Sequence, residues 1–207
     1  MKKRILFYGD SNTHGINPDN FSRYDDDIRF TGIVQNKLGE GYTIIEEGLM
    51  GRTTVIDDPG LEGANGITYL VPCLSSHAPI DTMVIMLGTN DSREVYGLST
   101  QDIAANMERV LKTAMSLPIW RDNPDILLLA PHPIEEVYEN GTLAQIMGHG
   151  CTEKTRDLSK YYREIADRVG TRFLDIKGIV EISSVDGIHF TKESHAMLAE
   201  ALLPFLK

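Results

Sequence analysis

Arg4-Ile5-Leu6-Phe7-Tyr8 is a short apolar, partly aromatic run that ends at Gly9-Asp10-Ser11. Such a run closed by a glycine is typical of a buried strand that leads into a tight turn. We therefore expect Ser11 to lie where the chain leaves the carboxyl edge of a sheet, which is where open α/β folds bind their ligands. The stretch predicts an α/β fold that presents a serine to a crevice.

Four further strand-like runs occur at residues 42–46, 82–87, 125–130 and 171–174, and helical periodicity separates most of them, notably at 30–38, 103–114, 156–169 and 192–206. Near-continuous apolar strands that alternate with helices predict a parallel sheet covered on both faces. We expect a three-layer, flavodoxin-like α/β sandwich with five strands. The long loops, at 15–27, 48–66 and 131–150, then rim one edge of the sheet and are expected to select the substrate.

A chain of 207 residues is long enough for one sizeable core, and we expect a single domain over residues 1–207. The formal net charge of -10 argues against nucleic-acid partners, because phosphate binding needs a basic face. The apolar run that follows Met1-Lys2-Lys3-Arg4 ends at Gly9 and is too short for a signal segment. No segment approaches the length of a membrane span. Cys73 and Cys151, the only cysteines, are far apart, which favours a reducing, cytoplasmic compartment and leaves their pairing open.

Asp186-Gly187-Ile188-His189 supplies the partners that a nucleophilic serine needs. A serine hydroxyl is a poor nucleophile unless a base accepts its proton, and that base needs an orienting acid. The spacing lets the Asp186 carboxylate reach Nδ1 of His189 and turn Nε2 toward Ser11. These three residues are the candidate catalytic set.

Donors for a developing oxyanion are expected from two other segments. Met83-Val84-Ile85-Met86-Leu87 is a buried strand that ends in Gly88-Thr89-Asn90-Asp91, so the Asn90 amide should lie at the same sheet edge as Ser11. Gly51 follows the second strand and has no side chain to block its N–H.

The chain resembles the SGNH, or GDSL, hydrolases on Gly9-Asp10-Ser11, Gly51, Gly88-Thr89-Asn90-Asp91 and Asp186-x-x-His189, which occur in family order across essentially the whole chain. Its second, third and last blocks look like an arylesterase and acyltransferase branch that acts on small acyl esters; the residues concerned are 46–49, 52–54, 85–91 and 186–191. The resemblance implies a strand order of 2-1-3-4-5, Ser11 as nucleophile, His189 as base, Asp186 as its partner, and Ser11 N–H, Gly51 N–H and Asn90 as oxyanion donors. It also implies a homo-oligomer, a small-molecule ester substrate and no cofactor.

The chain departs from that branch at several positions. Asn12 stands in place of the leucine of the GDSL name, and His14 and Ile16 replace tryptophans of the acyltransferase branch. We expect a smaller, more polar pocket wall and weaker acyl transfer to alcohols as a result. The candidate substrate-binding residues are Asp10, Asn12, His14, Ile16, His132 and Ile188.

The leading prediction is a serine esterase for acetyl-type esters, with acyl transfer to alcohols as an additional activity. A carbohydrate O-acetylesterase and a lysophospholipase or thioesterase of the same family stay open as alternatives. A flavodoxin-like phosphate or flavin binder is the rival from another class, because hydroxyls and a glycine follow the first strand at Ser11-Asn12-Thr13-His14-Gly15. We expect no metal site, since the acidic runs Asp25-Asp26-Asp27 and Asp57-Asp58 lack completing ligands.

Overall fold

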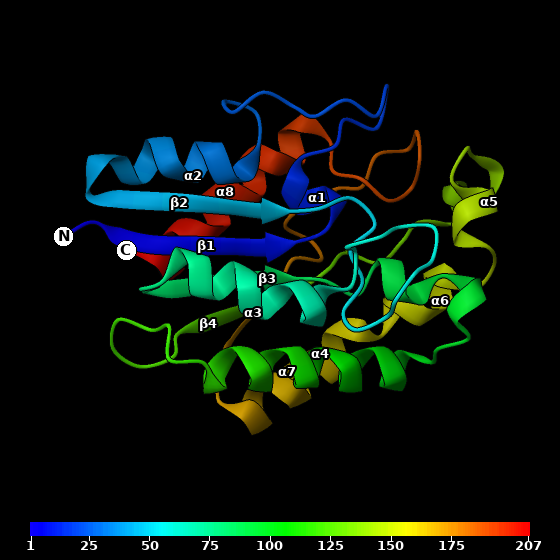
Figure 1. The fold of residues 1–207 in the computed structure, drawn as a ribbon. Helices are drawn as coiled ribbons and strands as arrows, with labels where there is room; N and C mark the ends of the chain where they lie inside the picture. Colours follow the sequence, from blue (N-terminus) through cyan, green and yellow to red (C-terminus); the bar gives the residue numbers. More distant parts are fainter.

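Five parallel strands form one sheet at the centre of the protein, in the order β2-β1-β3-β4-β5. The computed structural model describes all 207 residues, and Figure 1 shows β1 and β2 side by side. Their bounds are β1 (Lys3–Gly9), β2 (Tyr42–Gly48), β3 (Thr82–Met86), β4 (Ile126–Ala130) and β5 (Arg172–Asp175). The predicted fold class and strand order are therefore confirmed.

The register of the sheet brings three chain segments to one edge. Gly9 at the end of β1 lies opposite Gly48 of β2 and Met86 of β3. The residues after each strand, including Ser11 and Asn90, therefore leave the sheet close together, because parallel strands share one carboxyl edge.

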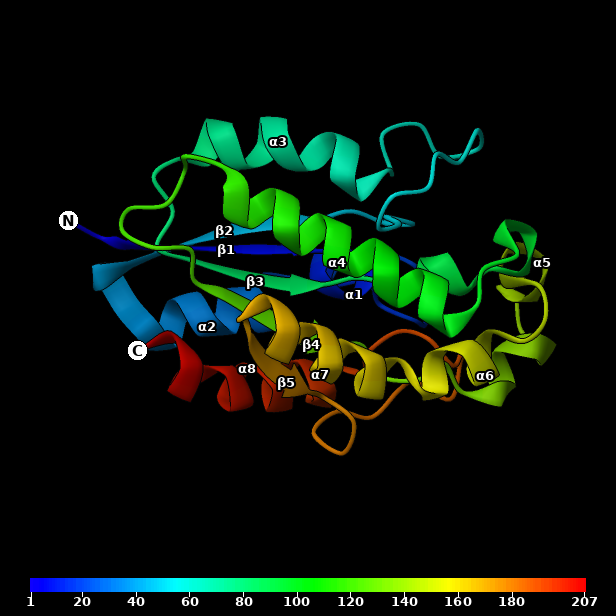
Figure 2. The same ribbon diagram turned by 90° about the horizontal axis from the view of Figure 1, so that it is seen from below.

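Helices cover both faces of the sheet, as expected for parallel strands joined by helical crossovers, and the central strands β3 and β4 are buried at every residue. Helices α2 (Phe30–Leu38) and α8 (Lys192–Leu206) pack together on one face, and α3 (Gly66–His77), α4 (Thr100–Ser116) and α7 (Leu158–Val169) cover the other. Figure 2 views the sheet with the second set in front. Shorter segments are α1 (Ser11–His14), α5 (Ala144–Met147), α6 (Cys151–Arg156), η1 (Gly39–Gly41), η2 (Asn90–Ser92), η3 (Glu94–Tyr96) and η4 (Glu136–Asn140).

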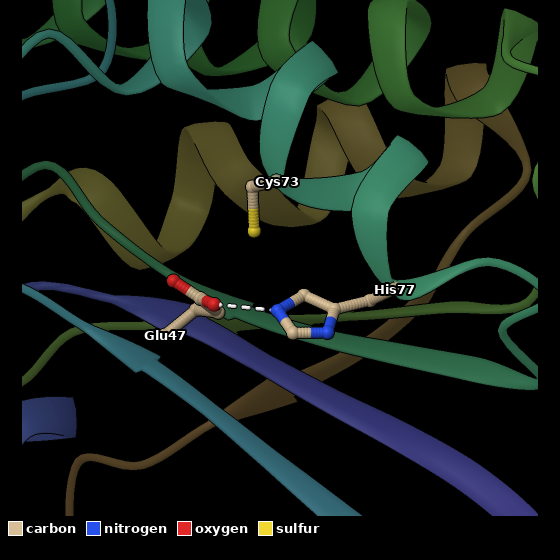
Figure 3. Close-up of side chains that lie close together, drawn as sticks. All are labelled: Glu47, Cys73 and His77. Carbon is tan, nitrogen blue, oxygen red and sulfur yellow. Dashed lines mark hydrogen bonds and ion pairs between the residues drawn. The ribbon is translucent and has the colours of Figure 1, made fainter.

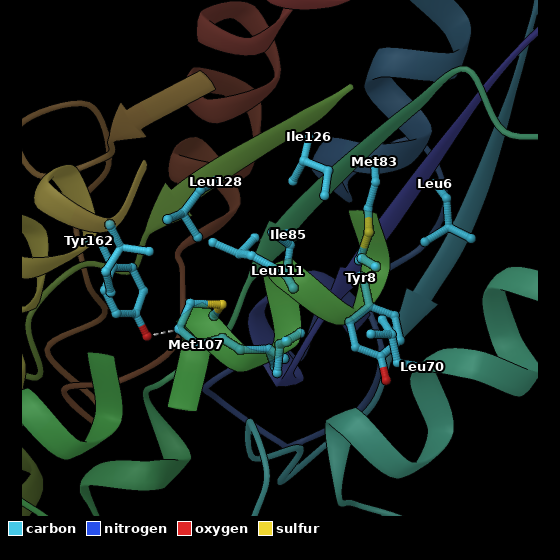
Figure 4. Packing of buried hydrophobic residues seen from close by; sticks show 14 of the residues in the cluster. Leu6, Tyr8, Leu70, Met83, Ile85, Met107, Leu111, Ile126, Leu128 and Tyr162 are labelled. Atoms are coloured by element: carbon cyan, nitrogen blue, oxygen red, sulfur yellow. Dashed lines mark hydrogen bonds between the residues drawn. The ribbon is translucent and has the colours of Figure 1, made fainter. Parts of the chain in front are cut away.

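Two apolar cores lie between the sheet and its helices. The larger holds 24 buried residues on the α3, α4 and α7 face, and the smaller holds 15 on the α2 and α8 face. Figure 4 shows Met83, Ile85 and Leu128 of the sheet facing Met107 and Leu111 of α4. Because every residue of β3 and β4 is buried, these strands form the rigid base on which the site is built.

Two details differ from the sequence-based expectation, and a third concerns the cysteine pairing that the sequence left open. The helix expected over residues 156–169 breaks at Asp157, so that α6 and α7 are separate. The loop expected at 131–150 contains η4 and α5, whose apolar side chains form a small cluster with Ile188. Cys73 and Cys151 are both buried and unpaired.

None of the helices combines the length and the apolar character that crossing a membrane requires.

Candidate active site

Ser11 begins α1, directly after the turn that closes β1. Asp10 is the N-cap residue of this helix, and its side chain accepts a hydrogen bond from the Asn12 N–H at 3.0 Å. This cap fixes the turn and so the direction in which the Ser11 hydroxyl points. Ser11 itself is only 7% exposed.

A continuous hydrogen-bonded chain joins Ser11, His189 and Asp186. Nε2 of His189 lies 2.9 Å from Oγ of Ser11, and Nδ1 lies 2.6 Å from Oδ2 of Asp186. All three side chains are buried. Because a carboxylate only accepts, it holds the proton on Nδ1 and leaves Nε2 free to accept from the serine.

The turn between Asp186 and His189 explains this geometry. Oδ1 of Asp186 accepts from the N–H groups of Ile188 and His189, both at 3.0 Å, so the same carboxylate holds the loop and the imidazole. Gly187 has φ +72, and an added Cβ would lie 2.7 Å from the Glu135 carbonyl oxygen. Glycine is therefore required at the second position of this turn.

The charge of Asp186 follows from its partners. Burial raises the pKa of Asp186, but the hydrogen bond and charge of His189, together with the two backbone N–H groups, lower the pKa by more. The net shift in pKa is downward, so the group is a carboxylate at neutral pH.

Asn12 links the serine to the histidine loop. Its Nδ2 donates to the Ile188 carbonyl at 3.1 Å, and its Oδ1 accepts from the Phe190 N–H at 3.0 Å. These bonds span the two ends of the chain and place His189 over Ser11. The predicted role of Asn12 in contacting substrate is therefore not supported by its position, because both polar atoms are engaged inside the protein.

The Asn90 amide faces the same space and is held in one orientation. Nδ2 donates to the Arg52 carbonyl at 3.1 Å, and Oδ1 accepts from Nη2 of Arg93 at 3.1 Å. Since guanidinium only donates, the Asn90 oxygen must face Arg93 and its NH₂ group must face away. One N–H of that group remains for a ligand.

Arg93 is itself held by Asp58, and the pair closes one side of the site. Nη1 of Arg93 lies 3.1 Å from Oδ2 of Asp58, which also accepts from the Tyr96 hydroxyl at 2.6 Å. The hydrogen bond from Tyr96, with the Gly60 N–H and the Arg93 charge, keeps the pKa of Asp58 below its usual range. The carboxylate therefore stays ionised beside the guanidinium.

A cavity of about 370 Å³ opens in front of Ser11. Ser11, Gly51, Asn90 and His189 lie in its wall. Gly51 has φ +73 and its N–H makes no hydrogen bond within the protein, so it is an available donor. The remaining lining residues are Phe21, Met50, Asp58, Gly60, Leu61, Arg93, Leu143, Ile146, Met147 and Ile188.

Of the six residues predicted to contact substrate, only Ile188 lines this cavity. Asp10 and Asn12 are buried in the turn and the loop contact described above, and Ile16 is 2% exposed. The Nδ1 atom of His14 lies 3.2 Å from the Gly48 carbonyl, away from the cavity. His132 lines a different cavity of about 530 Å³, with Glu135 and Arg156. His14 and Ile16 therefore do not form the pocket wall that was expected of them.

Most of the residues that form the wall were not predicted from the sequence. The three long segments do lie at the expected edge of the sheet. Phe21 comes from 15–27, Leu61 from 48–66 and Met147 from 131–150, and all three line the cavity. Asp57-Asp58 was interpreted as a solvated loop, whereas Asp58 pairs with Arg93 in the wall. Only Arg93 could have been predicted from the sequence. It comes three residues after Asn90, and that spacing lets its side chain reach back to Asn90 within a helical turn.

Comparison with known proteins identifies the family of the chain. The profile of the GDSL-like lipase/acylhydrolase family matches residues 7–197. An aryl esterase of M. smegmatis has 34% sequence identity and a TM-score of 0.90, covering 99% of this chain and 100% of that one. Est24, a carbohydrate acetylesterase from Sinorhizobium meliloti, has 34% identity and a TM-score of 0.87, covering 97% of this chain and 96% of that one.

A putative arylesterase from Agrobacterium tumefaciens str. C58 has 30% identity and a TM-score of 0.88, covering 98% of this chain and 97% of that one. No curated protein sequence matches the chain significantly. The matched profile spans most of the chain and the similar structures span nearly all of it. The chain therefore belongs to the GDSL-like lipase/acylhydrolase family, the SGNH hydrolases, and is a carboxylic ester hydrolase.

Proposed function

We propose that the protein hydrolyses esters of short acyl groups through an acyl-enzyme on Ser11. The observation that carries this proposal is the chain from Asp186 through His189 to Ser11, with distances of 2.6 and 2.9 Å, which ends at the wall of a cavity. Ser11 acts as nucleophile, His189 as general base and Asp186 as the group that orients the imidazole.

In the first half-reaction, Ser11 Oγ attacks the ester carbonyl while Nε2 of His189 takes its proton. The carbonyl oxygen becomes an oxyanion, for which the N–H groups of Ser11 and Gly51 and the Asn90 amide act as donors. The C–O bond to the alcohol then breaks, and His189 gives its proton to the departing alcohol oxygen. Water repeats these steps on the acyl-enzyme and releases the acid.

The cavity supports a small, partly apolar substrate. Its volume of about 370 Å³ lies near the lower end of small-molecule sites, and half of its 14 lining residues are hydrophobic. Two similar structures are described as an aryl esterase and a carbohydrate acetylesterase. We propose acetyl-type esters of aromatic alcohols as the first substrate class, since Phe21, Met50 and Leu61 offer apolar contact to a ring.

Acetylated sugars are the second candidate, because the Asp58–Arg93 pair presents charged groups to the same cavity. Sugar hydroxyls need such hydrogen-bonding partners, whereas an aromatic alcohol does not. Comparing p-nitrophenyl acetate with a singly acetylated monosaccharide, whose other hydroxyls are free, in the wild-type protein and an Asp58→Asn variant separates the two. A much larger loss of activity in the variant on the sugar ester than on p-nitrophenyl acetate favours the carbohydrate substrate, since the Asn90 orientation that depends on Asp58 through Arg93 serves both esters.

Transfer of the acyl group to an alcohol is a further proposed activity. The expectation of weak transfer rested on a polar wall at His14 and Ile16, and neither residue lines the cavity. Apolar contact around the acyl-enzyme favours a bound alcohol over water. We therefore expect measurable benzyl acetate when p-nitrophenyl acetate and benzyl alcohol are supplied together, and free acetate alone would oppose transfer.

A panel of p-nitrophenyl esters from acetate to octanoate tests the main proposal. We expect kcat/KM to be highest for the shortest acyl groups and to fall as the chain outgrows the cavity. The Ser11→Ala variant is the control for hydrolysis elsewhere on the protein. A rate that rises steadily toward octanoate would favour a lipase or thioesterase instead.

Two other properties complete the proposal. Phe21, Met50 and Ile146 line the cavity yet are 39%, 46% and 53% exposed, so a second copy that covered them would bury apolar surface, and we propose a homo-oligomer on this ground. Size-exclusion chromatography with light scattering tests this. Two unpaired thiols suit the reducing cytoplasm, which we propose as the location. The colour of the purified protein tests the flavin alternative, since a flavin binder would be yellow.

A further inference from the structure

A second cluster of reactive side chains lies outside the active-site cavity, between the end of β2 and helix α3. Glu47 comes from β2, and Cys73 and His77 come from one face of α3, one helical turn apart. Figure 3 shows the three side chains pointing toward one another. One ligand atom of each, the carboxylate oxygen, the Sγ atom and the imidazole nitrogen, lies within 4.8 Å of the other two.

The cluster joins a strand to a helix, is buried at Cys73 and is partly exposed at its other two residues. Cys73 is 1% exposed. The side chains of Glu47 and His77 are 17% and 31% exposed, so the approach from solvent runs past the imidazole. Nε2 of His77 lies 2.8 Å from Oε1 of Glu47, and the other carboxylate oxygen accepts from the Tyr69 hydroxyl at 3.3 Å.

Arg52 is the nearby cation, and its guanidinium is already engaged. It donates to the carbonyl oxygens of Gly9 and Glu47 and stacks over the Tyr8 ring at 4.2 Å. Burial and the Glu47 charge raise the pKa of the Cys73 thiol to about 12, while the Arg52 charge lowers it. In the unliganded protein Cys73 is therefore a protonated thiol.

We propose that Glu47, Cys73 and His77 form a binding site for a zinc ion. Sulfur, imidazole nitrogen and carboxylate oxygen are the three donor types that zinc takes in proteins, at bond lengths of about 2.0–2.3 Å. Such bonds set tetrahedral ligand atoms roughly 3.3–3.8 Å apart. Atoms that already lie within 4.8 Å reach this spacing by small side-chain rotations.

Binding changes the protonation of the cluster in a defined way. The Cys73 thiol releases its proton to solvent as the sulfur–zinc bond forms, and zinc replaces the hydrogen bond between His77 and Glu47. Thiolate and carboxylate together balance the charge of the ion. Water fills the fourth position, as is usual where the protein gives three ligands.

The donor set also distinguishes zinc from harder ions. Calcium and magnesium prefer oxygen ligands, and only one of the three residues offers oxygen. A thiolate with an imidazole instead selects zinc and its close substitute cobalt. Bound zinc would fasten α3 to the end of β2, beside the Arg52 side chain that joins β1 to β2.

Cobalt titration of the chelator-treated, full-length protein tests the site. We expect a near-ultraviolet thiolate-to-cobalt band that saturates at one equivalent and disappears when one equivalent of zinc is added. Cys73→Ser should abolish the band, and His77→Gln should weaken binding at least tenfold. Cys151→Ser, which removes the other buried cysteine, is the matched control and should keep the band.

Stability provides a second readout that does not depend on the spectrum. Zinc should raise the Tm of the wild-type protein progressively with its concentration and leave that of His77→Gln unchanged. The proposal is overturned if the wild-type protein shows no thiolate band, or if Cys73→Ser retains it. In that case Glu47 and His77 are a hydrogen-bonded pair beside a buried thiol. Esterase activity should persist in both variants, so this outcome is distinct from failure of the proposed function.

Discussion

Arg93 donates from Nη2 to the side-chain oxygen of Asn90 across 3.1 Å. The guanidinium is fixed by Asp58 on its other nitrogen, so the contact fixes the Asn90 amide with its N–H groups away from Arg93. An oxyanion donor acts only when it is aimed beforehand at the place where charge develops. Arg93 is thus a positioning residue for Asn90.

The Arg93–Asn90 contact predicts a specific pattern of non-additive effects. Asn90→Ala should lower kcat by about 10²–10³-fold, with a smaller effect on KM. Arg93→Met should lower kcat less, because the amide is still present but free to rotate. The double variant should match Asn90→Ala within about twofold, since Arg93 acts through Asn90. Multiplied losses in the double variant would show that Arg93 has an independent role.

The three residues of the hydrogen-bonded chain should also act as a unit. Ser11→Ala and His189→Ala should each reduce kcat by about 10⁴–10⁶-fold, and the double variant should be no slower than either. Asp186→Asn should keep the fold but favour the wrong imidazole tautomer, with a loss of about 10⁴-fold. Steady-state kinetics with p-nitrophenyl acetate measure all four. Additive losses would mean that Ser11 and His189 do not share one step.

Phe21 is the one residue other than glycine with a positive φ, at 57°, and its ring meets the His189 ring edge-on at 6.4 Å between centroids. A bulky residue in this conformation is strained by about 1–2 kcal/mol. Phe21→Asn tolerates the conformation and removes the ring, so we expect unchanged or higher stability and a several-fold higher KM for aryl esters. Met197 is also exposed, so Met197→Asn is the control for the effect of a polar residue at the surface. An unchanged KM in Phe21→Asn would show that Phe21 does not contact the substrate.

His195 should make the stability of the protein depend on pH. Burial, together with the charges of Arg29 and His189, lowers the pKa of His195 from 6.5 to about 4. Because the folded pKa lies below the unfolded one, the unfolded state binds more protons between these values. The contribution of neutral His195 to the free energy of unfolding is therefore fully present above about pH 6.5 and is lost progressively as the pH drops toward 4.

Between pH 7 and pH 5 this linkage corresponds to a loss of about 2 kcal/mol. His195 accepts from the Phe30 N–H at 3.3 Å, and the side-chain oxygen of an asparagine would keep an acceptor at that place. Urea denaturation of wild-type protein and His195→Asn at both pH values measures the difference. An equally steep loss of stability in the variant would place the titrating group elsewhere.

The sequence was most informative about reactive residues that directly follow an apolar strand. Apolar runs that end in Gly9-Asp10-Ser11 and Gly88-Thr89-Asn90 indicated the strands, and parallel strands share an edge, so both segments were expected in one place. The spacing of Asp186 and His189 was informative for the same reason, because a short turn allows only a few arrangements.

The cavity wall was less predictable because it depends on loop conformation. His14 and Ile16 follow Ser11 closely in sequence, yet α1 ends at Gly15 in a left-handed turn that directs the chain away from the cavity. Phe21 and Leu61 reach the wall from two loops and Met147 from the short helix α5, and contacts between segments so far apart in sequence leave no periodic signal. The Glu47, Cys73 and His77 cluster was missed likewise, since β2 and α3 are separated in sequence.

Covalent labelling with a p-nitrophenyl phosphonate, read by mass spectrometry of the digested protein, is the decisive experiment for Ser11 as the nucleophile. We expect one phosphonyl group per chain on the peptide that contains Ser11, with loss of esterase activity in step with labelling. His189→Ala should label far more slowly, and Ser11→Ala should not label at all. Equal labelling of Ser11→Ala, or full activity in a protein labelled at Ser11, would contradict the assignment of Ser11 as nucleophile.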